Sequence, residues 1–399
     1  MSRHLEPSLH RSFIKMKILF VHPAIRNYRE GIFRKLGEAG WNFLFTMINP
    51  DGTHAGEDTA RVLNSFQFKW FQCREIKNVR GLNNFSFDLW RVLRYDVVLF
   101  SCFTSVPFLL CTPILKLFGK KIVVFEETWK YQYSVKRYQL LLPYVRFLLK
   151  LCVSSFVVAG SRAREMLVQD FNISQNKIFI AYNTTLDLSE GIEDAIERSR
   201  IEELFKDFSK GRLVVLYLGR LVEIKAVDIL IQAMTKVDEK ACLLIVGEGE
   251  LKNDLESLAL RLGLSDRVKF LGAADPSEVG LYYSLSDISV LNSKFMPNYP
   301  VNAETWGFTL NEAMSLSIPV VASKAVGAQV DLIIDSETGM AVEENNVESL
   351  AEKINFLIAD DERRERIGRN GRDHLKQTCS YDQNFEAFQN AVAFAIEKK

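Results

Sequence analysis

The chain has 399 residues, which at about 150–200 residues per domain predicts two domains. Hydrophobic residues make up 48% and charged residues 25% of the chain, a globular composition that excludes a largely disordered protein. The six cysteines form no C-x-x-C pair and the five histidines are scattered. We therefore expect buried, reduced thiols in a cytosolic protein and no metal site.

The charge is unevenly distributed, although the net charge is zero. Residues 1–190 contain 26 Lys and Arg against 15 Asp and Glu, whereas residues 191–399 contain 24 against 35. A basic half favours an anionic partner, most simply a membrane surface or a nucleic acid. A chance distribution of solvated faces explains the same numbers, so both interpretations stay open.

The first half begins with a predicted polar leader, residues 1–15, and its first apolar run is too short for a signal peptide. Short apolar runs separated by helix-length segments then predict a parallel, doubly wound sheet. The predicted strands are Met16–His22, Trp41–Ile48, Asp96–Cys102, Lys121–Phe125, Phe156–Ala159 and Ile178–Tyr182, and Arg29–Ala39 is the first predicted helix. The first strand-helix junction, residues 22–28, lacks G-x-G-x-x-G, so we do not expect it to bind a dinucleotide.

Residues 97–115 carry no charge and are long enough for a membrane span. Pro107 and Pro113 interrupt them, however. A buried strand followed by a helix over Val106–Phe118 agrees better with the alternation seen along the whole chain.

Adjacent carboxylates and a basic amphipathic segment follow the predicted strand Lys121–Phe125. Glu126 and Glu127 suit a base with a raised pKa, but an acidic pair at a helix start is the simpler interpretation. Ser134–Cys152 mixes Lys and Arg with leucines and aromatic residues. Such a segment is typical of a lipid interface and equally of a helix packed on a sheet.

The second half repeats the alternation after a polar passage, Leu186–Lys210, that marks the domain boundary. Its predicted strands are Leu213–Leu218, Leu243–Val246, Val268–Leu271, Ile288–Leu291, Pro319–Ala322 and Gly339–Val342, and its predicted helices include Val227–Met234, Leu251–Leu262, Val347–Ile358 and Tyr381–Ile396. The chain is thus predicted to be α/β, with two doubly wound, Rossmann-like parallel-sheet domains, residues 1–190 and 191–379, facing across a cleft. Ligands bind at the carboxyl ends of such strands.

Cations and carboxylates gather at two predicted strand-helix junctions of the second half. Arg220 offers a planar fork and Lys225 a movable charge, both suited to phosphate oxygens, although two solvated loop cations explain them as well. Glu304 and Glu312 suit the hydroxyl groups of a sugar. Thr309 and Glu312 also fit a capping box.

The helix start at Gly307-Phe308-Thr309 is itself an anion site, whichever interpretation of Glu312 holds. The G-x-G of Gly247 and Gly249 resembles a fragment of a dinucleotide fingerprint, but a tight turn explains it too. Phe270 and Leu271 end a predicted strand and are expected at the same edge of the sheet.

Together these motifs resemble the retaining glycosyltransferases of the GT-B fold, glycosyltransferase family 4 (glycosyl transferases group 1). The matching segments are residues 219–221 with Lys225, residues 246–249, residues 268–272, the Glu-x(7)-Glu pair of Glu304 and Glu312, residues 312–323 and residues 326–333. The resemblance covers residues 212–375 well, whereas the first half is similar only in its alternation of strands and helices.

The resemblance implies a role for each site residue. Arg220 and Lys225, with Gly219 and Gly247 beside them, would bind the diphosphate of a nucleotide sugar, and Glu304 would face the sugar hydroxyls. Phe308, Thr309 and Leu310 would present backbone N–H groups, and Glu312 would hold the ribose. The resemblance also implies that no cofactor or metal is required and that helix 380–399 crosses back to the first domain.

The sequence departs from the family pattern at several positions. Ala226 follows Lys225 where the family usually has Gly, and residues 294–303 form a longer connection than is common. Many members place a histidine at the strand end that Glu126 and Glu127 occupy here, so no catalytic histidine carries over. Tyr28, Arg29, Glu126 and Glu127 are the acceptor-side candidates.

We therefore predict a retaining hexosyltransferase that acts on a lipid-linked or polysaccharide precursor in the cytoplasm, with peripheral attachment to the membrane face and no nucleic-acid partner. A nucleotide-sugar epimerase on the same architecture and a non-catalytic nucleotide-sugar-binding protein are the alternatives. The sequence does not name the nucleotide, the sugar, the acceptor or the oligomeric state.

Overall fold

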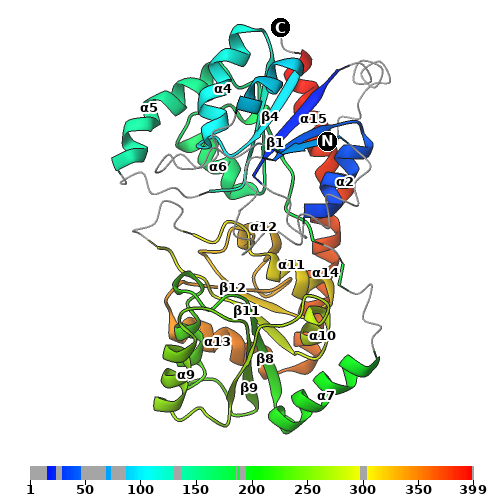
Figure 1. Ribbon diagram of the computed structural model, residues 1–399. Coiled ribbons are helices and arrows are strands. Elements are labelled where there is room, and N and C mark those ends of the chain that lie inside the picture. The colour runs from blue at the N-terminus through cyan, green and yellow to red at the C-terminus, as the bar shows by residue number, and fades with distance from the viewer. Residues whose placement is uncertain are drawn as a thin grey trace. The chain divides into compact units, whose positions relative to one another are not determined.

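The computed structural model describes residues 16–23, 29–45, 69–72, 87–129, 136–185, 187–188, 195–296 and 303–397. The chain forms two compact units, which we call unit 1 (Met1–Thr184 with Ser380–Lys399) and unit 2 (Thr185–Cys379) (Figure 1). The boundary was predicted after residue 190, whereas it lies between Thr184 and Thr185. The predicted leader and Tyr28 lie outside the described residues.

Unit 1 contains a seven-stranded parallel sheet in the order β3-β2-β1-β4-β5-β6-β7. The strands are β1 Ile18–His22, β2 Asn42–Phe45, β3 Trp70–Gln72, β4 Val97–Ser101, β5 Lys121–Glu126, β6 Ser155–Val158 and β7 Ile178–Ile180. The strand order reverses between β1 and β4, as in a doubly wound fold. Six of these strands were predicted, whereas β3 was missed because Lys69 and Gln72, polar residues on both sides of its two aromatic residues, leave no continuous apolar run.

The helices of unit 1 are α2 Glu30–Glu38, η2 Phe87–Arg94, α4 Val106–Leu117, α5 Lys136–Leu151, α6 Ser161–Gln169, η3 Gln175–Lys177 and α15 Tyr381–Glu397. The uncharged run 97–115 forms β4 and then α4, as predicted. Ser105 caps α4 by accepting a hydrogen bond from the N–H of Phe108 (3.4 Å). Across the described residues, no helix is long and apolar enough to cross a membrane.

The last helix of the chain, α15, packs on the sheet of unit 1 (Figure 1, red). Phe388 lies against Phe20, Phe125 and Trp41, with ring centroids 5.3–6.2 Å apart. The Ser155 hydroxyl donates to a carbonyl of α15 (2.7 Å). The helix that the sequence analysis assigned to the first domain therefore completes the apolar core of that domain.

Unit 2 contains a six-stranded parallel sheet in the order β10-β9-β8-β11-β12-β13. The strands are β8 Leu213–Leu218, β9 Ala241–Val246, β10 Val268–Gly272, β11 Ile288–Leu291, β12 Val320–Ser323 and β13 Met340–Val342. The helices are α7 Ala195–Ser209, η4 Glu223–Lys225, α8 Val227–Ala233, α9 Lys252–Arg261, α10 Val279–Ser284, α11 Phe308–Ser315, α12 Gln329–Leu332, α13 Val347–Ile358 and α14 Asp361–Thr378. The predicted pair of doubly wound α/β domains is thus confirmed, and the order of unit 2 reverses between β8 and β11.

We predict that Phe388→Ala lowers the free energy of unfolding by about 3–5 kcal/mol, because it removes a fully buried ring from the contact between α15 and the sheet. Chemical denaturation measures this loss. Phe356→Ala is the matched control, since its ring is 37% exposed. Equal losses in both variants would contradict the assignment of α15 to the core of unit 1.

Candidate functional site

The predicted donor residues gather at the carboxyl edge of the unit 2 sheet. Parallel strands end at one edge, and the position where the order reverses, between β8 and β11, is where such folds bind ligands. Gly219 and Arg220 follow β8, Gly247 follows β9, and α11 begins at Phe308.

Lys225 and Glu304 form an ion pair. Their Nζ and Oε2 atoms are 2.6 Å apart, and the two side chains are 11% and 18% exposed. Glu304 is fixed from both sides, because its N–H donates to Ala325 (3.1 Å) and its carbonyl accepts from the N–H of Gly327 (3.0 Å). The fold thus joins two predicted catalytic residues that lie 79 positions apart in the chain.

The residue after Lys225 adopts a left-handed conformation. Ala226 has φ 50° and ψ 39°, and it is buried. The side-chain amide of Asn292 donates to its carbonyl (2.8 Å) and holds the turn. A Cβ atom in this region costs about 1–2 kcal/mol. The structure therefore explains why the family usually has glycine at this position.

Glu312 accepts a hydrogen bond from the hydroxyl of Tyr283 on α10 (Oη to Oε2, 3.1 Å). Burial raises the pKa of Glu312, while this hydrogen bond and the charge of Lys225 lower it. The capping-box interpretation is wrong, because α11 begins at Phe308 behind Gly307 and Glu312 lies in its second turn. The carboxylate is therefore available for a ligand rather than for the helix start.

The start of α11 has two notable features. Gly307 has φ 100°, and a Cβ atom there would lie 2.7 Å from the side chains of Leu291 and Val326, so glycine is required. The Thr309 hydroxyl is buried and has no hydrogen-bond partner within the described residues. The N–H of Leu310 donates to the carbonyl of Gly307 (3.0 Å). The prediction that this N–H is presented to a ligand is therefore wrong.

The two glycines of the G-x-G at residues 247–249 allow neighbouring backbone segments to pack closely. A Cβ atom on Gly247 would lie 1.8 Å from the carbonyl oxygen of Gly219, and one on Gly249 would lie 2.3 Å from that of Leu221. The N–H of Leu221 donates to Glu248 (2.9 Å), which joins the loops after β8 and β9. The glycines thus support the backbone that carries Arg220.

Arg220 itself is exposed, and its side chain forms no ion pair with any residue that the structure describes. Its carbonyl accepts a hydrogen bond from the buried hydroxyl of Tyr217 (2.8 Å). Burial raises the pKa of Tyr217, as does the nearby charge of Glu304. Phe270 and Leu271 lie farther away, on the edge strand β10, where Phe270 packs against the core.

In unit 1, Arg29 and Glu127 form a partly buried network at the carboxyl edge of the sheet. Arg29 pairs with Glu127, donates to Asn183 (3.4 Å) and lies over the ring of Phe125 (5.0 Å). Asn183 also donates to Glu127 (3.0 Å). Asn183 was not predicted as a site residue. Its position directly after the predicted strand Ile178–Tyr182, where ligands bind in such sheets, could have indicated it.

Glu126 has a different role from its neighbour. It is 1% exposed and accepts hydrogen bonds from the N–H groups of Phe103 (3.3 Å), Glu127 (3.1 Å) and Thr128 (2.9 Å). The helix-start interpretation of the acidic pair is wrong for the described residues, since Glu126 ends β5 and α5 begins at Lys136. Glu126 anchors loop backbone. Across the described chain, no group of three or more potential metal ligands occurs.

Two doubly wound sheets, with cations and paired carboxylates at the carboxyl edge of the second, define a GT-B protein. Residues 199–374 match the family model of glycosyl transferases group 1. This match supports the resemblance over that segment.

Among curated relatives, the chain is 27% identical over 236 residues to the capsular polysaccharide biosynthesis glycosyltransferase CapM of Staphylococcus aureus. This match spans 57% of the chain and 58% of CapM. The chain is also 31% identical over 186 residues to the alpha-D-kanosaminyltransferase of Streptomyces kanamyceticus. This second match spans 46% of the chain and 46% of that relative. The matched region is thus at most about three fifths of these relatives.

Solved structures share the fold over almost the whole chain. Anabaena Alr3699/HepE in complex with UDP has a TM-score of 0.75 at 18% identity, covering 95% of this chain and 100% of that one. A glycosyltransferase from Rickettsia africae ESF-5 has a TM-score of 0.75 at 17% identity, covering 96% and 100%. At these identities the likeness concerns the fold.

We predict that Glu312→Gln raises the free energy of unfolding at pH 7. The pKa of Glu312 is raised in the folded state, so stability falls as the pH rises from its ordinary pKa of 4.5 through the folded-state value. The gain is about 1.4 kcal/mol for each unit by which the pKa is raised. It should vanish below pH about 4, where the carboxyl is protonated in both states.

Urea denaturation between pH 3.5 and 8 measures this difference. Glu352→Gln, on an exposed face of α13, is the control and should change stability little at any pH. A Glu312→Gln variant that is less stable than the parent at pH 7 would contradict the burial argument.

Proposed function

We propose that this chain is a retaining glycosyltransferase that moves a hexose from a nucleoside diphosphate sugar to an acceptor hydroxyl without a metal ion. The observation that carries the proposal is the Lys225–Glu304 ion pair, located beside the start of α11 in a segment of the group 1 family. Cations, carboxylates and a helix start together suit a ligand that is both phosphorylated and rich in hydroxyls.

In this proposal, Arg220 and Lys225 stabilise the negative charge that develops on the departing diphosphate. Arg220 is free to bind phosphate, whereas Lys225 is neutralised by Glu304 until the donor arrives. The donor then offers phosphate oxygens to Lys225 and sugar hydroxyls to Glu304. Glu312, already held by Tyr283, accepts hydrogen bonds from the ribose hydroxyls.

The acceptor is assigned to unit 1, where Arg29, Glu127 and Asn183 form the polar network at the carboxyl edge. Relatives named for capsular polysaccharide and lipopolysaccharide core biosynthesis support a polysaccharide or lipid-linked precursor as acceptor. Attack and departure on the same face of the sugar, with the leaving phosphate taking the acceptor proton, accounts for retention without a protein nucleophile.

We predict that one nucleoside diphosphate from the panel UDP, GDP, dTDP and ADP raises the melting temperature of the chain without added metal. At 100 times the dissociation constant, binding contributes about 2.7 kcal/mol. Glu312→Ala should abolish the shift. Lys225→Ala and Glu304→Ala should lower transfer by about 10² or more, because they remove charge stabilisation at the reacting centre.

Lys353→Ala is the matched control, since Lys353 also forms an ion pair, with Asp335 (2.9 Å), on another part of unit 2. Full transfer activity in both Lys225→Ala and Glu304→Ala would remove the site assignment. Product formed from the donor alone would indicate the epimerase alternative, and nucleotide binding without any turnover would indicate a binding protein.

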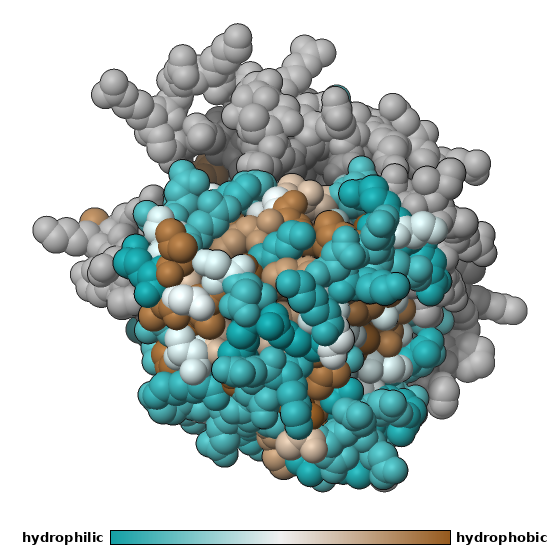
Figure 2. Space-filling model, turned by 90° about the horizontal axis from the view of Figure 1, so that it is seen from below, coloured by the Kyte–Doolittle hydropathy of each residue, from teal (hydrophilic) through white to brown (hydrophobic). Residues whose placement is uncertain are grey.

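We also propose an anionic membrane surface as a partner, and the outer face of α4 and α5 supports it. Neither helix contains an acidic residue, and Lys116 lies on α4, while Arg146 and Lys150 lie on α5. The exposed apolar side chains on and beside these helices are Leu110, Ile114, Leu117, Phe118, Leu140, Leu141, Tyr144, Phe147 and Leu151. By contrast, the face in Figure 2 is mainly hydrophilic with small apolar patches.

This apolar and basic face fits a bilayer that contains anionic phospholipids. A hydrogen bond from Tyr144 to the carbonyl of Leu109 (2.8 Å) joins α5 to α4, so the exposed apolar side chains lie on two neighbouring helices. Insertion of the apolar side chains into the bilayer and attraction of the basic side chains to anionic lipids would act together. Salt would screen only the electrostatic attraction.

We predict that replacing Leu117 and Phe118 together by Ser weakens binding to phosphatidylglycerol vesicles about tenfold or more, because both side chains are largely exposed (84% and 62%) and would enter the bilayer. Vesicle flotation at low and high salt measures this. Leu260 and Leu262 replaced by Ser, on the exposed face of unit 2, form the control pair. If the Leu117 and Phe118 variant and the Leu260 and Leu262 variant bound the vesicles equally well, the proposed membrane-binding surface would be contradicted.

A further inference from the structure

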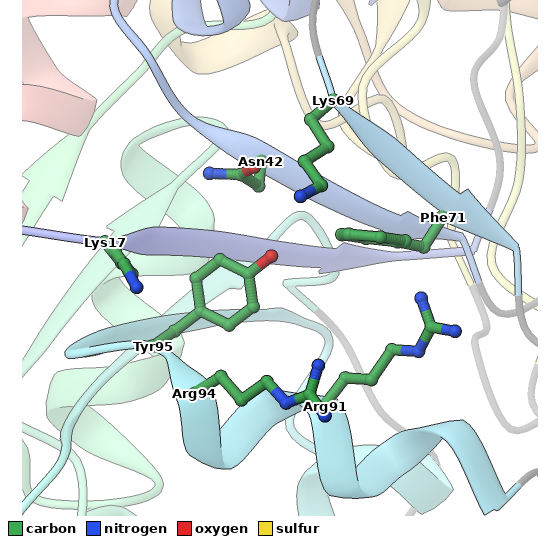
Figure 3. Close-up of a pocket in the computed structure, with 7 residues that line it drawn as sticks. All are labelled: Lys17, Asn42, Lys69, Phe71, Arg91, Arg94 and Tyr95. Carbon is green, nitrogen blue, oxygen red and sulfur yellow. The ribbon is translucent and has the colours of Figure 1, made fainter.

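A separate pocket lies at the amino edge of the unit 1 sheet. Lys17 precedes β1, Asn42 begins β2 and Lys69 precedes β3, while Arg91 and Arg94 come from η2 and Tyr95 follows it. Together with Phe71, these residues line a cavity of about 340 Å³ (Figure 3). A five-residue strand separates the two edges of a sheet by about 17 Å. This pocket is therefore distinct from the Arg29–Glu127 network at the carboxyl edge.

The charged side chains among the described residues that line this pocket are all positive. Four of its described lining residues are cations and none is acidic. Lys17, Lys69 and Arg94 are exposed, and none of these three side chains pairs with a carboxylate in the described part of the chain. Asp96, which follows the lining residues, is already engaged by Lys120 (3.5 Å) and by the N–H of Lys17 (3.0 Å).

Aromatic residues orient these cations. Lys69 and Arg91 lie over the ring of Phe71, at 5.5 Å and 4.8 Å from its centre. Tyr95 is 7% exposed, and Figure 3 shows its hydroxyl pointing toward the Lys69 amine. Burial raises the pKa of Tyr95, which keeps the hydroxyl protonated as a hydrogen-bond donor. Lys69, which precedes β3, and Arg91 of η2 thus line the same cavity as the neutral hydroxyl of Tyr95, which can donate a hydrogen bond.

Like charges that face one cavity repel each other unless an anion lies between them. Arginine offers a planar fork and lysine a mobile charge, the combination that binds phosphate oxygens. We propose that this pocket binds a phosphate group, carried either by a soluble phosphorylated molecule or by a lipid head group. This site goes beyond the proposed transfer reaction, whose residues lie at the carboxyl edges of the sheets.

The first arm of the test uses inorganic pyrophosphate and titration calorimetry on the full chain. Lys69→Gln with Arg94→Gln should weaken pyrophosphate binding by about tenfold or more for each cation removed. Lys324→Gln with Arg369→Gln, at two exposed positions of unit 2, is the matched control and should leave binding unchanged. Arg220→Gln with Lys225→Gln separates the pocket from the proposed donor site, because it should leave the pocket's binding event intact.

The second arm uses vesicles that contain phosphatidic acid. A loss of vesicle binding in the Lys69 and Arg94 variant, with no loss in the Lys324 and Arg369 control, would support the pocket and identify a lipid head group as the source. Pyrophosphate binding that depends on Lys69 and Arg94 would identify a soluble phosphate. If the Lys69 and Arg94 variant equals the parent in both arms, the proposal is overturned, whatever the donor-site variant does.

Discussion

The Lys225–Glu304 ion pair is the interaction on which the candidate site of unit 2 depends. Both side chains are largely removed from solvent, and removing one partner would leave a poorly solvated charge without compensation. Their meeting depends on backbone that neither residue provides. The left-handed turn at Ala226 positions Lys225, and hydrogen bonds to Ala325 and Gly327 fix Glu304. The parallel sheet brings these segments to one edge.

Several features at this edge lower stability rather than raise it. Ala226 adopts a conformation that favours glycine, Glu312 is buried enough to raise its pKa, and the Thr309 hydroxyl has no hydrogen-bond partner within the described residues. The rest of unit 2 compensates through apolar strands that are almost fully buried. Local strain and poorly solvated polar groups concentrated at one edge are typical of a site arranged for a ligand rather than for folding.

The two units use the same topology for different purposes. In each, the strand order reverses beside the first strand, and polar residues collect where strands end. Unit 1 has a partly buried Arg29–Glu127–Asn183 network at its carboxyl edge and a cluster of cations at its amino edge. The excess of positive charge in the first half of the chain is thus not spread evenly. Part of it borders the apolar face of α4 and α5, and part of it surrounds one pocket.

The alternation of strands and helices, the two doubly wound domains and the glycosyl transferases group 1 segment could all be predicted from the amino-acid sequence, because they follow from local apolar periodicity and from motifs with fixed spacing. Neither β3, which lacks a continuous apolar run, nor Asn183 was predicted. Three contacts became visible only in the folded chain: Glu312 accepts a hydrogen bond from Tyr283 instead of capping α11, Glu126 accepts hydrogen bonds from loop N–H groups, and the N–H of Leu310 is occupied. These outcomes depend on contacts between segments far apart in the chain, which local sequence patterns do not contain.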